Sequence, residues 1–182
     1  MAKLHLLDSL TVLKAADLAG KRVIDVGGGA GCPGVPLKIA CPEMKLTLLD
    51  SLGKRMNWLE QVLPTLGVEA RCVTARAEDA AADCRESDDY ATSRAVARLN
   101  ILLELTAPFV KVGGAVLAMK GAAAREELAE AQNAIRQLGL KLEQILEFPI
   151  DGTAHSVIVL RKVKPTPPKD PRRYAKIKQQ PL

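Results

Sequence analysis

Aromatic residues are scarce in this chain of 182 residues, which has one Trp, two Tyr and two Phe. Five aromatic side chains are too few to stack several unpaired bases, so any nucleic-acid partner would be bound mainly through its backbone. Histidine is also rare, and the four cysteines form no C-x-x-C pair. We therefore expect no metal site and interpret Cys32, Cys41, Cys72 and Cys84 as incidental or buried thiols.

Long apolar runs are absent as well. No stretch approaches the ~18 apolar residues that a membrane-spanning helix needs, and the residues from Met1 to His5 lack the apolar core of a secretory signal. These features predict a cytoplasmic protein that does not associate with membranes. With 48% apolar residues, the chain can bury one substantial core and has little room for a second domain.

Positive charge is concentrated at one end. Residues 161–182 contain eight Lys or Arg and one Asp, whereas the first 160 residues carry a net charge of −2. A basic end favours an anionic partner such as a phosphate backbone, because binding releases condensed counterions. The composition leaves open an alternative, which is a solvated and partly disordered tail.

Short apolar runs alternate with helical patterns, which is typical of βαβ units. The patterns predict helices at 2–18, 51–66, 99–109 and 122–138, and strands at 23–26, 46–50, 68–73, 89–92, 114–119, 140–148 and 156–162. The last two strands have no helix between them, so they should form a hairpin with one antiparallel strand. We expect an α/β domain over residues 1–164, with helices on both faces of a seven-stranded, mostly parallel sheet, and a basic, proline-rich tail over 165–182.

A glycine-rich loop, Gly27-Gly28-Gly29-Ala30-Gly31-Cys32-Pro33-Gly34, follows the first predicted strand. Glycine lets the backbone turn tightly and approach a ligand closely, and Pro33 suits the first turn of a helix. The string contains both G-x-G-x-G and G-x-G-x-x-G. Alone, it fits enzymes that bind S-adenosylmethionine and enzymes that bind a nicotinamide dinucleotide equally well.

Residues that follow the next strands separate these two classes. Asp50, at the end of the second strand, is placed to accept hydrogen bonds from both hydroxyls of a ribose, although it could instead cap the following helix. Ala77-Glu78 follows the third strand, where an adenine contact would lie, and Ser93-Arg94 follows the fourth. Nicotinamide enzymes need neither of these pairs. The combination therefore favours a methyltransferase.

Longer strings at the same places resemble a known family. They are His5-Leu6-Leu7-Asp8-Ser9-Leu10, Leu48-Leu49-Asp50-Ser51-Leu52-Gly53-Lys54-Arg55 and Ser93-Arg94-Ala95, together with the glycine loop. Over nearly the whole chain, they are similar to the ribosomal RNA small subunit methyltransferase G family, also called glucose-inhibited division protein B. The resemblance implies a Rossmann-like class I methyltransferase that uses S-adenosylmethionine to form N7-methylguanine in the decoding-region loop of 16S ribosomal RNA.

The resemblance also implies site residues. Gly27, Cys32, Ala77, Glu78 and Arg94 fall on positions that contact S-adenosylmethionine in the family. Gly29, Gly31 and Asp50 join this set on the loop and ribose arguments above. Guanine N7 carries a lone pair and no proton, so we expect catalysis by positioning and no catalytic base. Arg94 is expected to line the pocket, with Lys120, His5 and Asp8 near its mouth.

Several positions depart from the family pattern. The family usually begins with a further helical segment, so the chain looks shortened before the His5 string. Gly28 stands where Thr is common, Cys32 where a bulkier residue is usual, and Asp88 where an apolar residue is expected. The first two departures predict a looser pocket near the methionine part of the cofactor.

Basic residues are the expected contacts to ribosomal RNA or the small subunit, because phosphate contacts dominate such binding. These candidates are Lys54, Arg55, Lys120, Arg161, Lys162, Lys164, Arg172 and Arg173. For Lys54 and Arg55 the alternative is a solvated helix face. Two other functions stay open, a non-catalytic ribosome-binding protein of the same family and an NAD-dependent oxidoreductase. A monomer is the default expectation.

Overall fold

Seven strands form one sheet in the order β3-β2-β1-β4-β5-β7-β6. The computed structural model describes residues 2–182, with side chains from residue 4 onward, so Met1 and the expectation of a shortened start lie outside it. The strands are β1 (Arg22–Val26), β2 (Lys45–Asp50), β3 (Ala70–Thr74), β4 (Asp88–Arg94), β5 (Val110–Lys120), β6 (Leu140–Ile150) and β7 (Thr153–Lys162). Strands β1 to β6 run in one direction, and β7 runs antiparallel to both of its neighbours, β5 and β6. The predicted α/β class and the terminal hairpin are confirmed.

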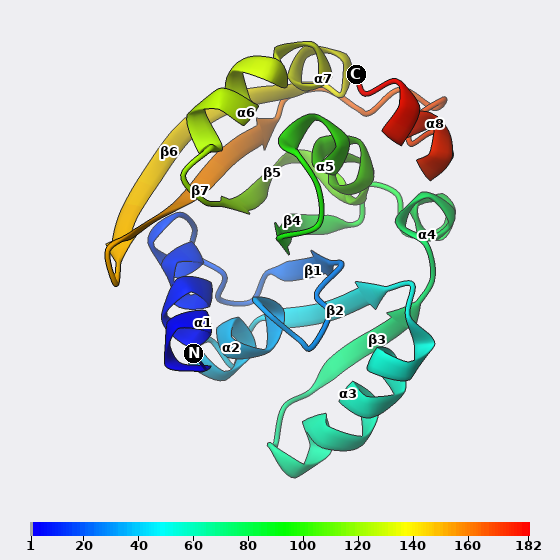
Figure 1. Ribbon diagram of the computed structural model, residues 1–182. Helices are drawn as coiled ribbons and strands as arrows, with labels where there is room; N and C mark the ends of the chain where they lie inside the picture. The colour runs from blue at the N-terminus through cyan, green and yellow to red at the C-terminus, as the bar shows by residue number, and fades with distance from the viewer. Residues whose placement is uncertain (1) are drawn as a thin grey trace.

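Helices cover both faces of the sheet, as predicted (Figure 1). One face packs against η1 (Thr11–Lys14), α2 (Gly34–Ala40) and α3 (Gly53–Thr65). The other packs against α4 (Ala77–Asp83), α5 (Leu99–Thr106), η2 (Ala107–Phe109), α6 (Ala124–Glu130) and α7 (Gln132–Gln137). Of the helices in residues 2–182, none is both long and apolar enough to cross a membrane.

The second half of β5 is apolar at successive positions because both faces of the strand are buried there. In β5, Val116 and Ala118 belong to the core on the α5 side, whereas Ala115 and Leu117 belong to the core on the α3 side. Successive side chains of a strand point to opposite faces, so a strand covered on both sides needs apolar residues at every position.

Two helix boundaries differ from the prediction. The expected helix over 2–18 is α1 (Ala2–Leu10) followed by the short η1, and the chain then turns before Gly20, where the Asp17 carboxylate accepts a hydrogen bond from Ala19 N. The expected helix over 122–138 is interrupted at Ala131, which is fully buried between α6 and α7.

The C-terminal segment, residues 165–182, packs against the domain. It contains α8 (Tyr174–Gln179), which lies beside α4 and α5 (Figure 1). Thr166, Asp170 and Ile177 are almost completely buried. The alternative of a solvated, disordered tail is therefore wrong. A basic, proline-rich composition is typical of such tails, but here polar side chains of the domain bind the irregular backbone of the segment.

Three charged side chains of the domain hold this segment. The Arg85 guanidinium donates to the backbone oxygens of Thr166, Pro167 and Asp170 over 2.7–2.9 Å. The buried Lys162 ammonium donates to Thr166 Oγ1 at 2.5 Å, and burial lowers the pKa of this amine. Glu104 binds Arg172 through two side-chain hydrogen bonds of 2.6 and 2.7 Å. Such pairs are costly to break when buried, so the segment is fixed in place.

Gly114 supplies a test of how closely β4 and β5 approach. A Cβ at this position would lie 2.2 Å from the backbone oxygen of Asp89 and 2.8 Å from Val110 Cγ1. We expect Gly114→Ala to lower the free energy of unfolding by about 1–3 kcal/mol, the usual cost of overpacking. Gly53→Ala is the control, because its Cβ would make only an ordinary 3.5 Å contact with Thr74. Urea unfolding measures both variants, and equal stabilities would contradict the close approach.

Candidate functional site

The carboxyl ends of β1 to β5 meet at one edge of the sheet, and the strand order reverses between β1 and β4. Ligands of open α/β sheets bind in the crevice at such a point. Two cavities lie at this edge. The small cavity, about 150 Å³, is lined by residues that include Gly27, Asp50, Ala77, Glu78, Val96 and Tyr174. The large cavity, about 510 Å³, is lined by residues that include His5, Asp8, Arg94, Val96, Lys120 and His155. Val96 lines both, so the cavities adjoin.

The glycine loop forms one wall of the small cavity through Gly27. This residue has φ +72°, and a Cβ there would lie 2.5 Å from Val96 Cγ2, so only glycine fits without displacing Val96. Gly29, Gly31 and Cys32 continue the loop but lie outside the linings of both cavities. The structure therefore brings one of these four predicted residues directly to the site.

Asp50 joins the loop to β2. Its carboxylate accepts hydrogen bonds from Gly29 N at 3.1 Å and from Leu52 N at 2.9 Å, and Arg55 Nη1 lies 3.9 Å away. The alternative role as the cap of α3 is not found, because the capping position is Leu52 and α3 has no side-chain cap. Asp50 is 8% exposed, and that exposed part lines the small cavity.

Ala77 and Glu78 begin α4 on the opposite wall of the small cavity. Glu78 Oε1 accepts a hydrogen bond from Tyr174 N at 3.1 Å. Tyr174 was not among the predicted site residues, since nothing in a basic, proline-rich segment indicates that it packs at this edge of the sheet.

Three charged or polar side chains from distant elements meet in the large cavity. Asp8 of α1 accepts from Arg94 Nη1 at 3.2 Å and lies 2.8 Å from Nδ1 of His155, which belongs to β7. The carboxylate fixes the imidazole ring, so Nδ1 carries the proton and Nε2 is an acceptor in the neutral ring. His5, Asp8 and Arg94 line this cavity, as expected, whereas Arg94 does not line the small cavity, and its contact with S-adenosylmethionine stays a prediction. His155 was missed, although its being one of two histidines was a usable signal.

Lys120 also lines the large cavity, at the end of β5. Its ammonium donates to the backbone oxygen of Ala97 at 2.5 Å and pairs with Glu127 at 2.7 Å, and its side chain is only 7% exposed. Because Glu127 lines the same cavity and neutralises this ammonium, Lys120 is not a free contact for phosphate. Across residues 2–182, no group of three or more His, Cys, Asp or Glu is arranged to hold a metal ion.

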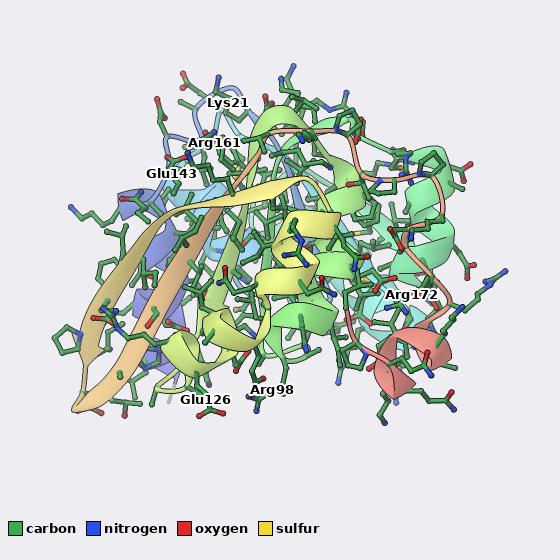
Figure 2. All side chains as sticks on the ribbon, turned by 90° about the horizontal axis from the view of Figure 1, so that it is seen from above. Lys21, Arg98, Glu126, Glu143, Arg161 and Arg172 are labelled. Atoms are coloured by element: carbon green, nitrogen blue, oxygen red, sulfur yellow. The ribbon has the colours of Figure 1, made fainter. Side chains whose placement is uncertain are left out.

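The basic residues of β7 lie far from the site. Because β7 is antiparallel, its last residues lie toward the opposite edge of the sheet: Arg161 pairs with Ala115, which is level with the start of β1. Figure 2 shows Arg161 and Glu143 on the side that carries Lys21, away from Arg98 at the cavity edge. Lys162 is completely buried, so the prediction that it contacts RNA is wrong. Lys164, just beyond β7, is exposed near the same remote edge.

The other basic residues predicted to contact RNA differ in their exposure and in their ion pairs. Lys54 and Arg55 are exposed on the first turn of α3, next to Asp50. Arg173 is exposed and pairs with Asp79. Arg172 is bound to the buried Glu104, so its charge is already neutralised and a contact to phosphate is not supported.

Asp25 lies beneath the glycine loop and is completely buried. Its Oδ2 accepts a hydrogen bond from Gly34 N at 2.8 Å, while Oδ1 has no partner among the described residues. Burial raises the pKa of this carboxyl to about 7, partly offset by the Gly34 hydrogen bond and the charge of Arg94. A Cβ at Gly28 would lie 2.7 Å from Asp25 Oδ2, so the glycine leaves room for this carboxyl.

Asp88 is the third residue that departs from the family pattern. Its carboxylate lies 3.9 Å from Arg22 at the opposite edge of the sheet, and it lines neither of the two cavities.

A family model described as rRNA small subunit methyltransferase G matches residues 1–155. Curated relatives agree over almost the full chain. The Ribosomal RNA small subunit methyltransferase G of Clostridium kluyveri is 44% identical, covering 99% of this chain and 78% of the relative. That of Alkaliphilus oremlandii is 47% identical, covering 98% and 77%. The chain belongs to this family. The resemblance seen in the sequence is confirmed, and the NAD-dependent oxidoreductase interpretation loses its support.

Solved structures agree on the fold. The chain resembles M. jannaschii TYW2, solved in complex with AdoMet, with a TM-score of 0.70 at 13% identity, covering 88% of this chain and 77% of that one. Geranyl diphosphate C-methyltransferase of Streptomyces coelicolor gives a TM-score of 0.69 at 13% identity, covering 86% and 79%. These similarities support the class I methyltransferase fold.

The pKa of Asp25 predicts a pH-dependent stability. Between about pH 4 and pH 7 the folded protein keeps a proton that the unfolded chain loses, so this carboxyl makes stability fall as the pH rises through that window. Asp25→Asn keeps an oxygen for Gly34 N and cannot ionise. We expect the variant to gain stability relative to the parent between pH 5 and pH 8, by an amount on the order of 1–4 kcal/mol. Urea unfolding at both pH values measures this difference, and parallel pH profiles would rule out the burial effect.

Proposed function

We propose that the protein uses S-adenosylmethionine to methylate N7 of a guanine in the decoding-region loop of 16S ribosomal RNA, in the small ribosomal subunit. The observation that carries the proposal is the pair of adjoining cavities, which share Val96 at the carboxyl edge of the sheet in a chain of this family. Adjoining cavities suit a reaction in which one ligand passes a group directly to another, because alignment supplies much of the rate.

The small cavity fits the nucleoside part of the cofactor. A carboxylate has about four acceptor sites, so Asp50 retains capacity for two ribose hydroxyls after binding the Gly29 and Leu52 amides. Gly27 lets the loop backbone lie close to Val96 in the cavity wall, where a Cβ would overlap the valine, and Glu78 of the same lining is placed to meet the adenine. M. jannaschii TYW2, a protein of the same fold, was solved in complex with AdoMet, which supports S-adenosylmethionine as the cofactor.

The large cavity fits the target guanine. When bound, S-adenosylmethionine supplies an electrophilic methyl group, and its C–S bond breaks as the N7 lone pair forms the new C–N bond. No proton leaves N7 in this step, so the residues of the large cavity need to bind and orient the base without removing a proton. The Asp8 carboxylate is fixed between Arg94 and His155, so these three side chains have a set geometry in which to orient the base.

RNA contacts outside the cavities are proposed for Lys54, Arg55 and Arg173, whose side chains are exposed on the same edge as the cavities. Phosphate contacts of this kind position a substrate without reading its sequence. Trp58, 51% exposed one turn after Lys54, adds an aromatic face on the same helix. Monomeric state and cytoplasmic location stay predictions.

The deciding experiment is transfer of labelled methyl from S-adenosylmethionine to small subunits purified from cells that lack this activity. The modified base is then identified by mass spectrometry. N7-methylguanine in the decoding-region loop is the expected product. Methylation at another atom would correct the specificity, and binding of both ligands without transfer would support a non-catalytic ribosome-binding protein.

Asp50→Asn tests the cofactor assignment. Replacing one charged acceptor by an amide weakens the hydrogen bonds to the ribose, and a bond to a charged group is worth roughly 1.5–3 kcal/mol, so the Kd should rise about 10-fold or more. Isothermal titration with S-adenosylhomocysteine measures the Kd. Asp17→Asn, on a surface turn, is the matched control. An unchanged Kd for a correctly folded Asp50→Asn protein would exclude Asp50 from the cofactor site.

A further inference from the structure

Tyr174 is part of the wall of the small cavity, although it lies 124 residues beyond Asp50 in the chain. It is the first residue of α8, and it is half-buried. The described residues give its hydroxyl no hydrogen-bond partner, and Arg76 lies over its ring at 5.9 Å from the ring centre. The ring itself is therefore what Tyr174 presents to the cavity.

The start of α8 is tied to the start of α4 by two consecutive pairs of residues. Tyr174 N donates to Glu78 Oε1 at 3.1 Å, and the Arg173 guanidinium pairs with Asp79. The Tyr174 amide thus fixes one oxygen of the Glu78 carboxylate and leaves the other available as an acceptor.

Anchors on both sides of Tyr174 prevent the wall from moving freely. Arg172 binds Glu104 of α5, which is fully buried, and Arg172 N donates to the same carboxylate at 2.9 Å. Ile177, one turn further along α8, is also fully buried. A wall anchored in this way is already ordered before a ligand arrives, which lowers the entropic cost of binding.

We propose that the C-terminal segment forms the adenine side of the cofactor site, with the Tyr174 ring packed against the purine and its backbone amide orienting Glu78. The free Glu78 oxygen accepts a hydrogen bond from the exocyclic amine of adenine and disfavours a base that has a carbonyl there. This inference rests on the proposed function, because it takes the ligand of the small cavity to be S-adenosylmethionine. It gives the basic end of the chain a role in cofactor affinity and base selectivity.

The test compares variants of the full chain by isothermal titration with S-adenosylhomocysteine and with its inosine analogue. Tyr174→Ala removes the ring and keeps the amide. Tyr174→Pro removes both the ring and the amide proton. Proline is tolerated here because residue 174 is the first of the helix and the preceding residue, Arg173, has an extended backbone (φ −60°, ψ 137°). Tyr174→Phe keeps the ring, and Lys178→Ala, exposed on the same helix, is the control.

We expect Tyr174→Ala to raise the Kd for S-adenosylhomocysteine roughly 10-fold, as loss of one base–aromatic contact does, while the preference over the inosine analogue stays. Tyr174→Pro should also reduce that preference several-fold, an effect that a merely structural role of the segment would not produce. Tyr174→Phe and Lys178→Ala should match the parent protein.

Two results separate the possible failures. If the parent protein binds S-adenosylhomocysteine and Tyr174→Ala, folded by circular dichroism, binds it equally well, the inference is overturned and the proposed function stands. If the parent protein does not bind S-adenosylhomocysteine, the proposed function fails and this inference fails with it.

Discussion

The reversal of strand order between β1 and β4 is the constraint on which the rest of this structure depends. Chain connections leave the sheet in opposite directions at that point, so helices cover both faces and a crevice opens between the loops after β1 and β4. Gly27 and Val96 meet across this crevice, where a Cβ on residue 27 would lie 2.5 Å from the valine. Val96 lines both cavities, so it lies where they adjoin.

Buried charge organises the elements around that crevice. Asp8, Arg94 and His155 join α1, β4 and β7 at the large cavity, whereas Glu104 and Arg172 join α5 to the C-terminal segment. A buried ion pair adds little net stability but is costly to break, so such pairs select one arrangement of the elements over others. In this protein they place segments that are remote in sequence beside the ligand cavities.

The two cavities divide the proposed reaction between them. Asp50 and the C-terminal segment surround the place of the nucleoside, while Asp8 and its partners surround the place of the base that accepts the methyl group. Since the attacking nitrogen has no proton to lose, the protein needs shape and charge at this edge rather than a catalytic base. The polar groups observed there are held by neighbours, as a positioning mechanism requires.

The sequence by itself determined the order of the strands along the chain, the place of the glycine loop after the first strand, the place of Asp50 at the end of the second, and the family. These depend on local periodicity and on residues close together in the chain. Only the tertiary structure decided which basic residues are available. Lys162 and Arg172 look alike in a basic segment, yet one is buried against backbone oxygens and the other is bound to Glu104. The tertiary structure likewise brought His155 and Tyr174 to the cavities. Burial and ion pairing arise from contacts between residues far apart in the chain, and the composition of a segment does not indicate which contacts it makes.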